Sequence, residues 1–175
     1  MKKYMTIGSI GSFLLGIISV MLYKMLLKDV FFSLAVTFFT TFYHFIMRVA
    51  VGCAVVRLRK NKDISEQFTI SRTESRFYEF IKVKKWKKYM PTYNRQLFSI
   101  WDNSYRTVMH NMENALAGHF IMVILSFVPL AFANIVGGFV PFLITSVLAA
   151  VFDILLVFVQ RYNMARMGCI LKRIK

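Results

Sequence analysis

Four long apolar stretches limit the ways in which this 175-residue chain can fold. The first runs without a charge from Met5 to Tyr23, and about 20 such residues are enough to cross a bilayer as a helix. The spans that we predict cover residues 5–23, 30–56, 115–135 and 139–159. Because 57% of the residues are hydrophobic, little remains for a separate soluble core. We therefore predict an all-α integral membrane protein with four transmembrane helices, forming a single domain over residues 1–175.

The first apolar stretch also resembles a signal peptide, because Lys2 and Lys3 precede it. No small-residue cleavage site follows it, so we expect an uncleaved helix. Small residues share one face of this helix and would let a neighbouring helix approach closely. They are Gly8, Ser12, Gly16 and Ser19.

Residues 57–114 are basic and aromatic, and we predict that they form an interfacial segment between the second and third spans. Lysines alternate with aromatic and aliphatic residues from Phe77 to Asn94, a mixture that suits the headgroup level of a membrane. The stretch from Trp101 to His110 is expected to be irregular. Although the net charge is +15, no nucleic-acid motif accompanies it, so the expected partners are anionic lipid headgroups. The alternative is a solvated loop that only sets the topology.

The distribution of charge predicts the orientation of the chain. The N-terminus, the middle segment and the tail hold nearly all Lys and Arg, while the short connections hold only Lys24 and Lys28. Four spans place the three basic segments on one side, which the positive-inside rule makes cytoplasmic. We therefore predict a multi-pass protein of the cell membrane with cytoplasmic N- and C-termini. The sequence makes no prediction of an oligomeric state.

Two charged residues lie inside the predicted spans. Thr37, Thr41, His44 and Arg48 share one face of the second span. Counted from the cytoplasmic ends of their spans, Arg48 and Asp153 lie within about 3 Å in height. We predict that they form a structural ion pair, because a charge within a span needs a partner. For His44, packing is favoured over a functional role.

Three features carry a resemblance to a known family: the Phe80–Lys88 stretch, His119 at the start of an apolar span, and the Val159–Asn163 run. From Phe77 onwards the chain resembles the glycosyl-4,4′-diaponeurosporenoate acyltransferases, small bacterial membrane proteins of carotenoid glycolipid synthesis. The resemblance implies transfer of a fatty acyl group to a hydroxyl of a lipid-linked sugar, a carotenoid glycoside or another glycolipid.

The chain departs from the family's pattern at two places. The family has Arg-Ala-Glu and, after two further residues, His; this chain has Asn114, Ala115 and Leu116 before His119. The nearest acid, Glu113, shares the face of His119 only if the helix begins later. In the tail, Met164 and Ala165 replace Arg-Pro, while the matching positions are Arg161, Tyr162, Asn163 and Arg166.

We predict His119 as the general base of acyl transfer, since histidine is the side chain most often used for proton transfer near neutral pH. Glu113 is the predicted acid beside it. The predicted substrate-binding residues are Lys84, Lys85, Trp86, Arg161, Tyr162, Asn163 and Arg166. Acyl-CoA or acyl carrier protein is the expected co-substrate, and no resident cofactor is expected. Cys53 and Cys169 have no metal-ligand spacing, so no metal is expected.

A second hypothesis comes from another functional class. Leu116 stands where the family has Glu, which favours a non-catalytic membrane protein that binds lipid or acts as a scaffold. A packed or capping His119 fits that hypothesis equally well.

Overall fold

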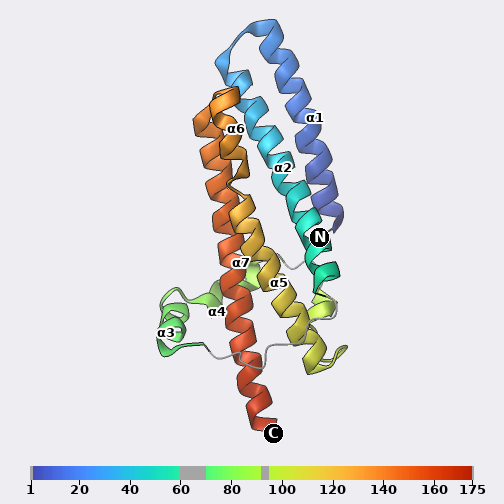
Figure 1. Ribbon diagram of the computed structural model, residues 1–175, viewed down its shortest axis with the longest axis vertical. Helices are drawn as coiled ribbons and strands as arrows, with labels where there is room; N and C mark the ends of the chain where they lie inside the picture. The colour runs from blue at the N-terminus through green and yellow to red at the C-terminus, as the bar shows by residue number, and fades with distance from the viewer. Residues whose placement is uncertain (1, 60–69, 92–94, 175) are drawn as a thin grey trace. The chain divides into compact units, whose positions relative to one another are not determined.

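The computed structural model describes residues 2–59, 70–91 and 95–174 (Figure 1). Its elements are α1 (Lys2–Leu26), α2 (Asp29–Leu58), α3 (Arg72–Phe80), α4 (Val83–Trp86), η1 (Lys87–Tyr89), η2 (Arg95–Phe98), α5 (Tyr105–Leu125), α6 (Val128–Val136) and α7 (Phe139–Ile174). The chain divides into two compact units. We call Met1–Cys53 with Ile121–Asp153 the apolar unit, and Ala54–Phe120 with Ile154–Lys175 the basic unit.

Among the described residues, four helical stretches are long and apolar enough to cross a membrane. They are Tyr4–Leu26, Asp29–Leu58, Tyr105–Val136 and Phe139–Cys169. The predicted all-α class with four transmembrane helices is therefore confirmed. The expectation of irregular structure up to His110 is wrong beyond Ser104, because α5 begins at Tyr105. The helix of the fourth span also continues past Val159 to Ile174.

The third stretch consists of two helices, because α5 ends at Leu125 and α6 begins at Val128. Pro129 lies in the first turn of α6, and it lacks the N–H that would bond the carbonyl of Leu125 four residues earlier. The Tyr43 hydroxyl of α2 donates to that carbonyl at 2.9 Å. A backbone group in apolar surroundings thus keeps a partner.

The small residues of α1 lie against aromatic rings of α2. A Cβ added to Gly8 would lie 3.0 Å from the Phe45 ring, and one added to Gly16 would lie 3.1 Å from the Phe39 ring. Even an alanine at either position would therefore push on a phenyl ring. The predicted small-residue face thus receives a neighbouring helix.

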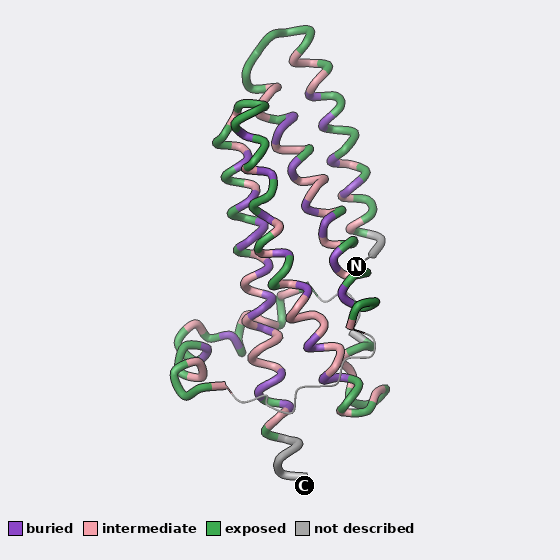
Figure 2. Tube along the Cα trace, viewed as in Figure 1, coloured by how far each residue is buried: buried purple, intermediate pink, exposed green. Residues whose placement is uncertain are grey.

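Many residues of the apolar unit are exposed, drawn green in Figure 2, and many of these have large hydrophobic side chains. Examples are Ile10, Met21, Ile124, Ile135 and Leu148. Soluble proteins rarely expose contiguous apolar surface of this extent. In a bilayer the same side chains face lipid.

In the basic unit, α3 and α4 pack against α7. Ser71 caps α3, because its hydroxyl accepts a hydrogen bond from the Glu74 backbone N–H at 3.0 Å. Lys82 has a left-handed backbone conformation, with φ 53°, and it reverses the chain between α3 and α4. As a result, Tyr78 and Val83 form a small core with Val159 of α7.

Candidate functional site

Three consecutive residues of α7, Arg161, Tyr162 and Asn163, each contact the segment from α3 to η1. Arg161 meets Glu74 of α3, Tyr162 meets Tyr78 of α3 and Lys87 of η1, and Asn163 meets Lys87. Arg161 donates two hydrogen bonds to the Glu74 carboxylate, at 2.9 and 2.8 Å. The same carboxylate accepts a hydrogen bond of 2.6 Å from the Tyr78 hydroxyl. Arg161 therefore fixes α3 to α7.

The charge of Arg161 also sets the acidity of its neighbours. Its hydrogen bonds hold the pKa of Glu74 below the ordinary value, so this carboxyl stays ionised at neutral pH. Burial, together with the adjacent Glu74 carboxylate, raises the pKa of Tyr78 to about 12. The Tyr78 hydroxyl is therefore a hydrogen-bond donor and not a base at physiological pH.

Aromatic side chains surround Tyr162. Its ring meets the Tyr78 ring edge to face, with centroids 6.2 Å apart, and Trp86 packs against the same small core. The Trp86 indole N–H donates to the Ile81 carbonyl at 2.8 Å. The structure thus places Trp86, predicted as a substrate-binding residue, as a half-buried residue against the small core on which Tyr162 also packs.

Positive charges gather around the Tyr162 ring. The Lys87 ammonium lies 2.6 Å from Asn163 Oδ1 and 4.8 Å from the centre of the Tyr162 ring. The Arg166 guanidinium lies 6.0 Å from the same centre. Burial lowers the pKa of Lys87, and repulsion from Arg166 and Lys84 lowers it further. We call Lys84, Lys87 and Arg166 the cation cluster.

The cation cluster has the chemistry of an anion-binding site. Cations that repel one another are stabilised by an anion, and ammonium and guanidinium groups form strong hydrogen bonds with phosphate or carboxylate oxygens. Both lysines predicted for this role are exposed residues of α4, and of the two it is Lys84 whose charge acts on Lys87. Lys87 is the lysine that the structure brings to Tyr162 and Asn163.

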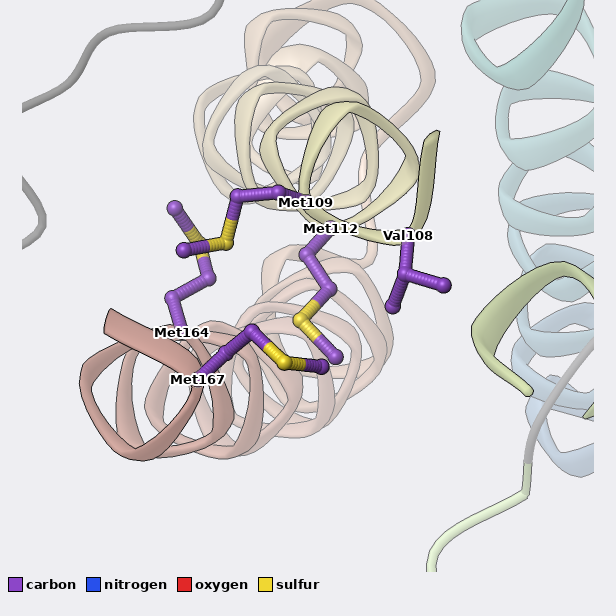
Figure 3. Close-up of a cluster of buried hydrophobic side chains, with 5 residues drawn as sticks. All are labelled: Val108, Met109, Met112, Met164 and Met167. Atoms are coloured by element: carbon purple, nitrogen blue, oxygen red, sulfur yellow. The ribbon is translucent and has the colours of Figure 1, made fainter. Parts of the chain in front are cut away.

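The position of His119 follows from the packing of α5 against α7. Met109 and Met112 of α5 interlock with Met164 and Met167 of α7 (Figure 3), and Leu116 packs against this cluster. His119 is half-buried and lies about one helical turn, roughly 4.5 Å, beyond Leu116. It lies about 10 Å along α5 from Met112, beyond the methionine cluster.

Glu113 is buried and interacts with Arg59. The Arg59 Nη2 atom lies 3.3 Å from a Glu113 carboxylate oxygen, and its Nε–H donates to Asn114 Oδ1 at 3.0 Å. Because α5 begins at Tyr105, Glu113 and His119 belong to one continuous helix. Residues six apart do not share a face, unlike those three or four apart. Glu113 would face His119 only if the helix began after Glu113. Because it begins earlier, the two residues lie on different faces of α5.

In the apolar unit the structure brings Arg48 and Asp153 together. Arg48 Nη2 lies 2.6 Å from Asp153 Oδ2, and the Asp153 side chain is fully buried. Arg48 also donates to the carbonyls of His44, at 3.3 Å, and Ala149, at 3.2 Å. This is the pairing that the matched depths of the two residues predict.

Sequence reasoning missed Glu74 and Arg59, the ion-pair partners of Arg161 and Glu113. Glu74 carries a usable signal, because Ser71 and Glu74 have the spacing of a capping box at a helix start. No comparable signal points to Arg59. Among the described residues, no three His, Cys, Asp or Glu side chains gather closely enough to hold a metal ion.

The features around Tyr162 and His119 all lie within one part of the chain, which also carries a family match. Residues 60–173 match the model of the glycosyl-4,4′-diaponeurosporenoate acyltransferases. The chain belongs to this family. The match covers about two thirds of the chain and includes the whole cation cluster, while α1 and α2 lie outside it. No curated protein and no solved structure matches the chain.

Proposed function

We propose that this protein transfers a fatty acyl group from an activated donor to a hydroxyl of a membrane-bound glycoside. One observation carries the proposal: within the family-matched region, Lys87 and Arg166 converge on Tyr162 and Asn163. Such a group of cations suits the phosphate groups of acyl-CoA or of the phosphopantetheine of an acyl carrier protein.

The proposed chemistry is a direct transfer. A ring nitrogen of His119 takes the proton from the sugar hydroxyl, whose oxygen attacks the acyl carbonyl carbon. The new ester bond forms as the carbon–sulfur bond of the donor breaks, and the thiolate leaves with the electron pair. His119 returns its proton to that thiolate, which regenerates the neutral imidazole.

The height of His119 suits an amphiphilic acceptor. Such an acceptor keeps its sugar at the headgroup level and its tail in hydrocarbon. Mostly polar residues precede Ala115 in α5 and mostly apolar residues follow it, so we place the headgroup level near Ala115 and His119 about one helical turn inside it. Glu113 forms an ion pair with Arg59. We propose that it influences the reaction through the electrostatic potential near the site and not by direct contact with His119.

We place this chemistry at the cytoplasmic face, with both termini cytoplasmic, because the basic segments share one side of four spans. The topology can be tested by labelling single cysteines from outside the cell, after Cys53 and Cys169 are replaced by serine. A cysteine introduced near Gly138 should react and one introduced near Lys62 should not. The reverse pattern would contradict the orientation.

Acyl transfer is tested by comparing the lipids of cells with the protein, without it, and with the His119→Ala variant. We expect an acylated glycolipid only with the unchanged protein, provided that the variant reaches the membrane in equal amount. Purified protein in vesicles that contain a lipid-linked glycoside and acyl-CoA should form the same product. Unchanged lipids in all three strains, with no product in vesicles, would contradict the proposal.

A non-catalytic lipid-binding or scaffold role is the second candidate. The observation that favours it is Leu116, which packs against the methionine cluster where the family has an acid. In that case the purified protein would still bind acyl-CoA or glycolipid, but no acyl chain would move between them.

A further inference from the structure

The apolar unit contains a pocket of about 380 Å³. Its wall comes from α1, α2, α6 and α7, and every lining residue belongs to the apolar unit. Among the lining residues are Val20, Tyr23, Phe39, Tyr43, Phe132 and Phe142. The pocket is therefore a feature of one compact unit and shares no residue with the candidate site of the basic unit.

Two hydroxyl groups of the wall are already bonded within the protein. The Thr40 hydroxyl donates to the Val36 carbonyl of its own helix, and the Tyr43 hydroxyl donates to the Leu125 carbonyl at 2.9 Å. The remaining wall consists mainly of aliphatic and aromatic side chains. Because burial of a polar group without a partner is costly, this wall suits hydrocarbon and not a sugar or a charged group.

The dimensions of the pocket match one acyl chain. From Phe32 to Tyr43, the lining residues of α2 cover about 16 Å of helix. One leaflet contributes about half of a hydrocarbon core that is roughly 30 Å thick. An apolar cavity of about 150 Å³ holds benzene, so by volume this pocket has room for roughly 15 carbon atoms. A single chain from one leaflet therefore fills it.

Contacts within the apolar unit fix both ends of the pocket. At one end, the ring centroids of Tyr23 and Phe32 lie 5.6 Å apart. At the other end, the hydrogen bond from Tyr43 to the Leu125 carbonyl joins α2 to the last residue of α5. The pocket is therefore preformed, and a chain that enters it need not reorganise the helices.

Two lysines lie at the Tyr23 end of the pocket. Lys24 follows Tyr23 directly, and Lys28 lies in the connection between α1 and α2, at the top of Figure 1. Both side chains are exposed. The adjacent acid, Asp29, offsets one of the two positive charges, which leaves a net charge of +1 at this end. An anionic headgroup is favoured there over a zwitterionic one.

Selection of a lipid at this pocket depends on the headgroup. Lipid chains are as apolar as the wall, so burial of hydrocarbon alone gives little preference within a membrane. We propose that the pocket binds one acyl chain of an anionic phospholipid, with the phosphate beside Lys24 and Lys28. The chain runs from Tyr23 towards Tyr43. Because no lining residue belongs to the basic unit, the proposal does not rest on the proposed acyl transfer.

Photolabelling of the full-length protein in nanodiscs tests the proposal. The probe is a phosphatidylglycerol with a diazirine near the end of one chain, and the comparison probe is a phosphatidylcholine with the same chains. We expect adducts on α2 near Tyr43 and on α6 near Phe132, located by mass spectrometry, with about fivefold more from phosphatidylglycerol. Ile124 of α5 is 71% exposed and does not line the pocket, so both probes should label it equally. Equal labelling of the pocket residues by the two probes would overturn the proposal, as would a lack of adducts there.

Matched variants separate the pocket from the rest of the surface. Ala35 lines the pocket, so Ala35→Phe should fill it and reduce labelling of the pocket residues about tenfold. Ala131→Phe adds the same bulk at an exposed position of α6 outside the pocket and should leave the labelling unchanged. Equal effects of the two variants would contradict binding in the pocket.

Charge variants decide the outcome if Ala35→Phe does not fold. Lys24→Gln combined with Lys28→Gln should remove the preference for phosphatidylglycerol at the pocket. Arg57→Gln combined with Lys88→Gln removes two exposed charges of the basic unit and should keep the preference. A full preference that persists without Lys24 and Lys28 would overturn the proposal.

Discussion

The two units of this protein each contain an arginine paired with an acid, in opposite surroundings. In the apolar unit, the side chains of Arg48 and Asp153 are 15% and 0% exposed. In the basic unit, those of Arg161 and Glu74 are 39% and 23% exposed. Removing one partner of a buried pair leaves a charge without compensation, whereas an exposed pair is screened by water.

The two arginine–acid pairs have different roles in the two units. The apolar unit uses its pair to keep two charges within a hydrophobic bundle. The basic unit uses its pair to hold α3 against α7, which leaves the neighbouring cations Lys87 and Arg166 around Tyr162. We therefore expect mutations in the apolar unit to affect mainly stability, and mutations in the basic unit to affect mainly turnover.

The largest effect expected is on turnover, from His119→Ala in the basic unit. Loss of a general base should lower product formation roughly 10²- to 10⁴-fold, because the sugar hydroxyl would keep its proton. The assay is acyl transfer by purified protein in vesicles. His110→Ala, a histidine change within the same helix, serves as control and should retain activity. Normal turnover by His119→Ala would remove this histidine from the mechanism.

The next effect should appear in the apolar unit. Asp153→Asn leaves the Arg48 charge without its partner and should lower the free energy of unfolding by about 3–5 kcal/mol. Denaturant or thermal unfolding in detergent measures the change. Adding Arg48→Gln should recover part of the loss, because the isolated charge is removed. Strictly additive losses would show that the two residues do not interact, and Glu74→Gln should cost far less.

A smaller effect is expected at the cation cluster. Lys87→Ala should raise the KM for the acyl donor about tenfold at low salt, as expected for a lost charge-assisted hydrogen bond, and by less at high salt. Lys88→Ala removes an exposed neighbouring charge and should change KM less. Because the pKa of Lys87 is lowered, its charge is lost at a lower pH than that of an ordinary lysine. The KM of the unchanged enzyme should therefore rise at a pH below the ordinary lysine pKa of 10.5, and that of Lys87→Ala should lack this rise.

The smallest effect concerns the exposed pair. Arg161 holds the pKa of Glu74 below its ordinary value of 4.5. The resulting stabilisation is present above that ordinary value and is lost as the pH falls through the lowered pKa. We expect a loss of about 1 kcal/mol or less, visible as a change in Trp86 fluorescence in a Trp101→Phe background. Glu74→Gln should abolish this transition, and an unchanged transition in that variant would assign it to another group.

The sequence predicts those features that depend on helix geometry alone. Spans follow from the length of apolar stretches, and the pairing of Arg48 with Asp153 follows from a fixed rise per residue. The start of α5 was missed because polar residues such as Arg106 and His110 interrupt the apolar pattern between Tyr105 and Asn114. Met109 and Met112, which lie in this part of α5, are buried because they pack against Met164 and Met167 of α7. That contact cannot be derived from the sequence pattern of α5 alone.

The contacts of the candidate site depend on a chain reversal that carries no sequence signal. Lys82 adopts a left-handed conformation, which is uncommon for residues other than glycine, so nothing in the sequence marks this position as a turn. Without that reversal, the meeting of Lys87 with Asn163, residues far apart in the chain, cannot be derived. From the sequence, the lysines of this stretch are equivalent candidates for a contact with Asn163. In the described structure the one that makes this contact is Lys87.

The hydrogen bond from Tyr43 to Leu125 has a consequence for membrane insertion. Because Pro129 cannot donate to the Leu125 carbonyl, the third span enters the bilayer with one backbone group that its own helix does not satisfy. The donor belongs to α2, which is synthesised earlier and can already be in the membrane when α5 and α6 arrive. The Tyr43 donor is therefore synthesised before the Leu125 carbonyl that requires it. With Tyr43→Phe, the newly inserted third span would have no such donor waiting for it.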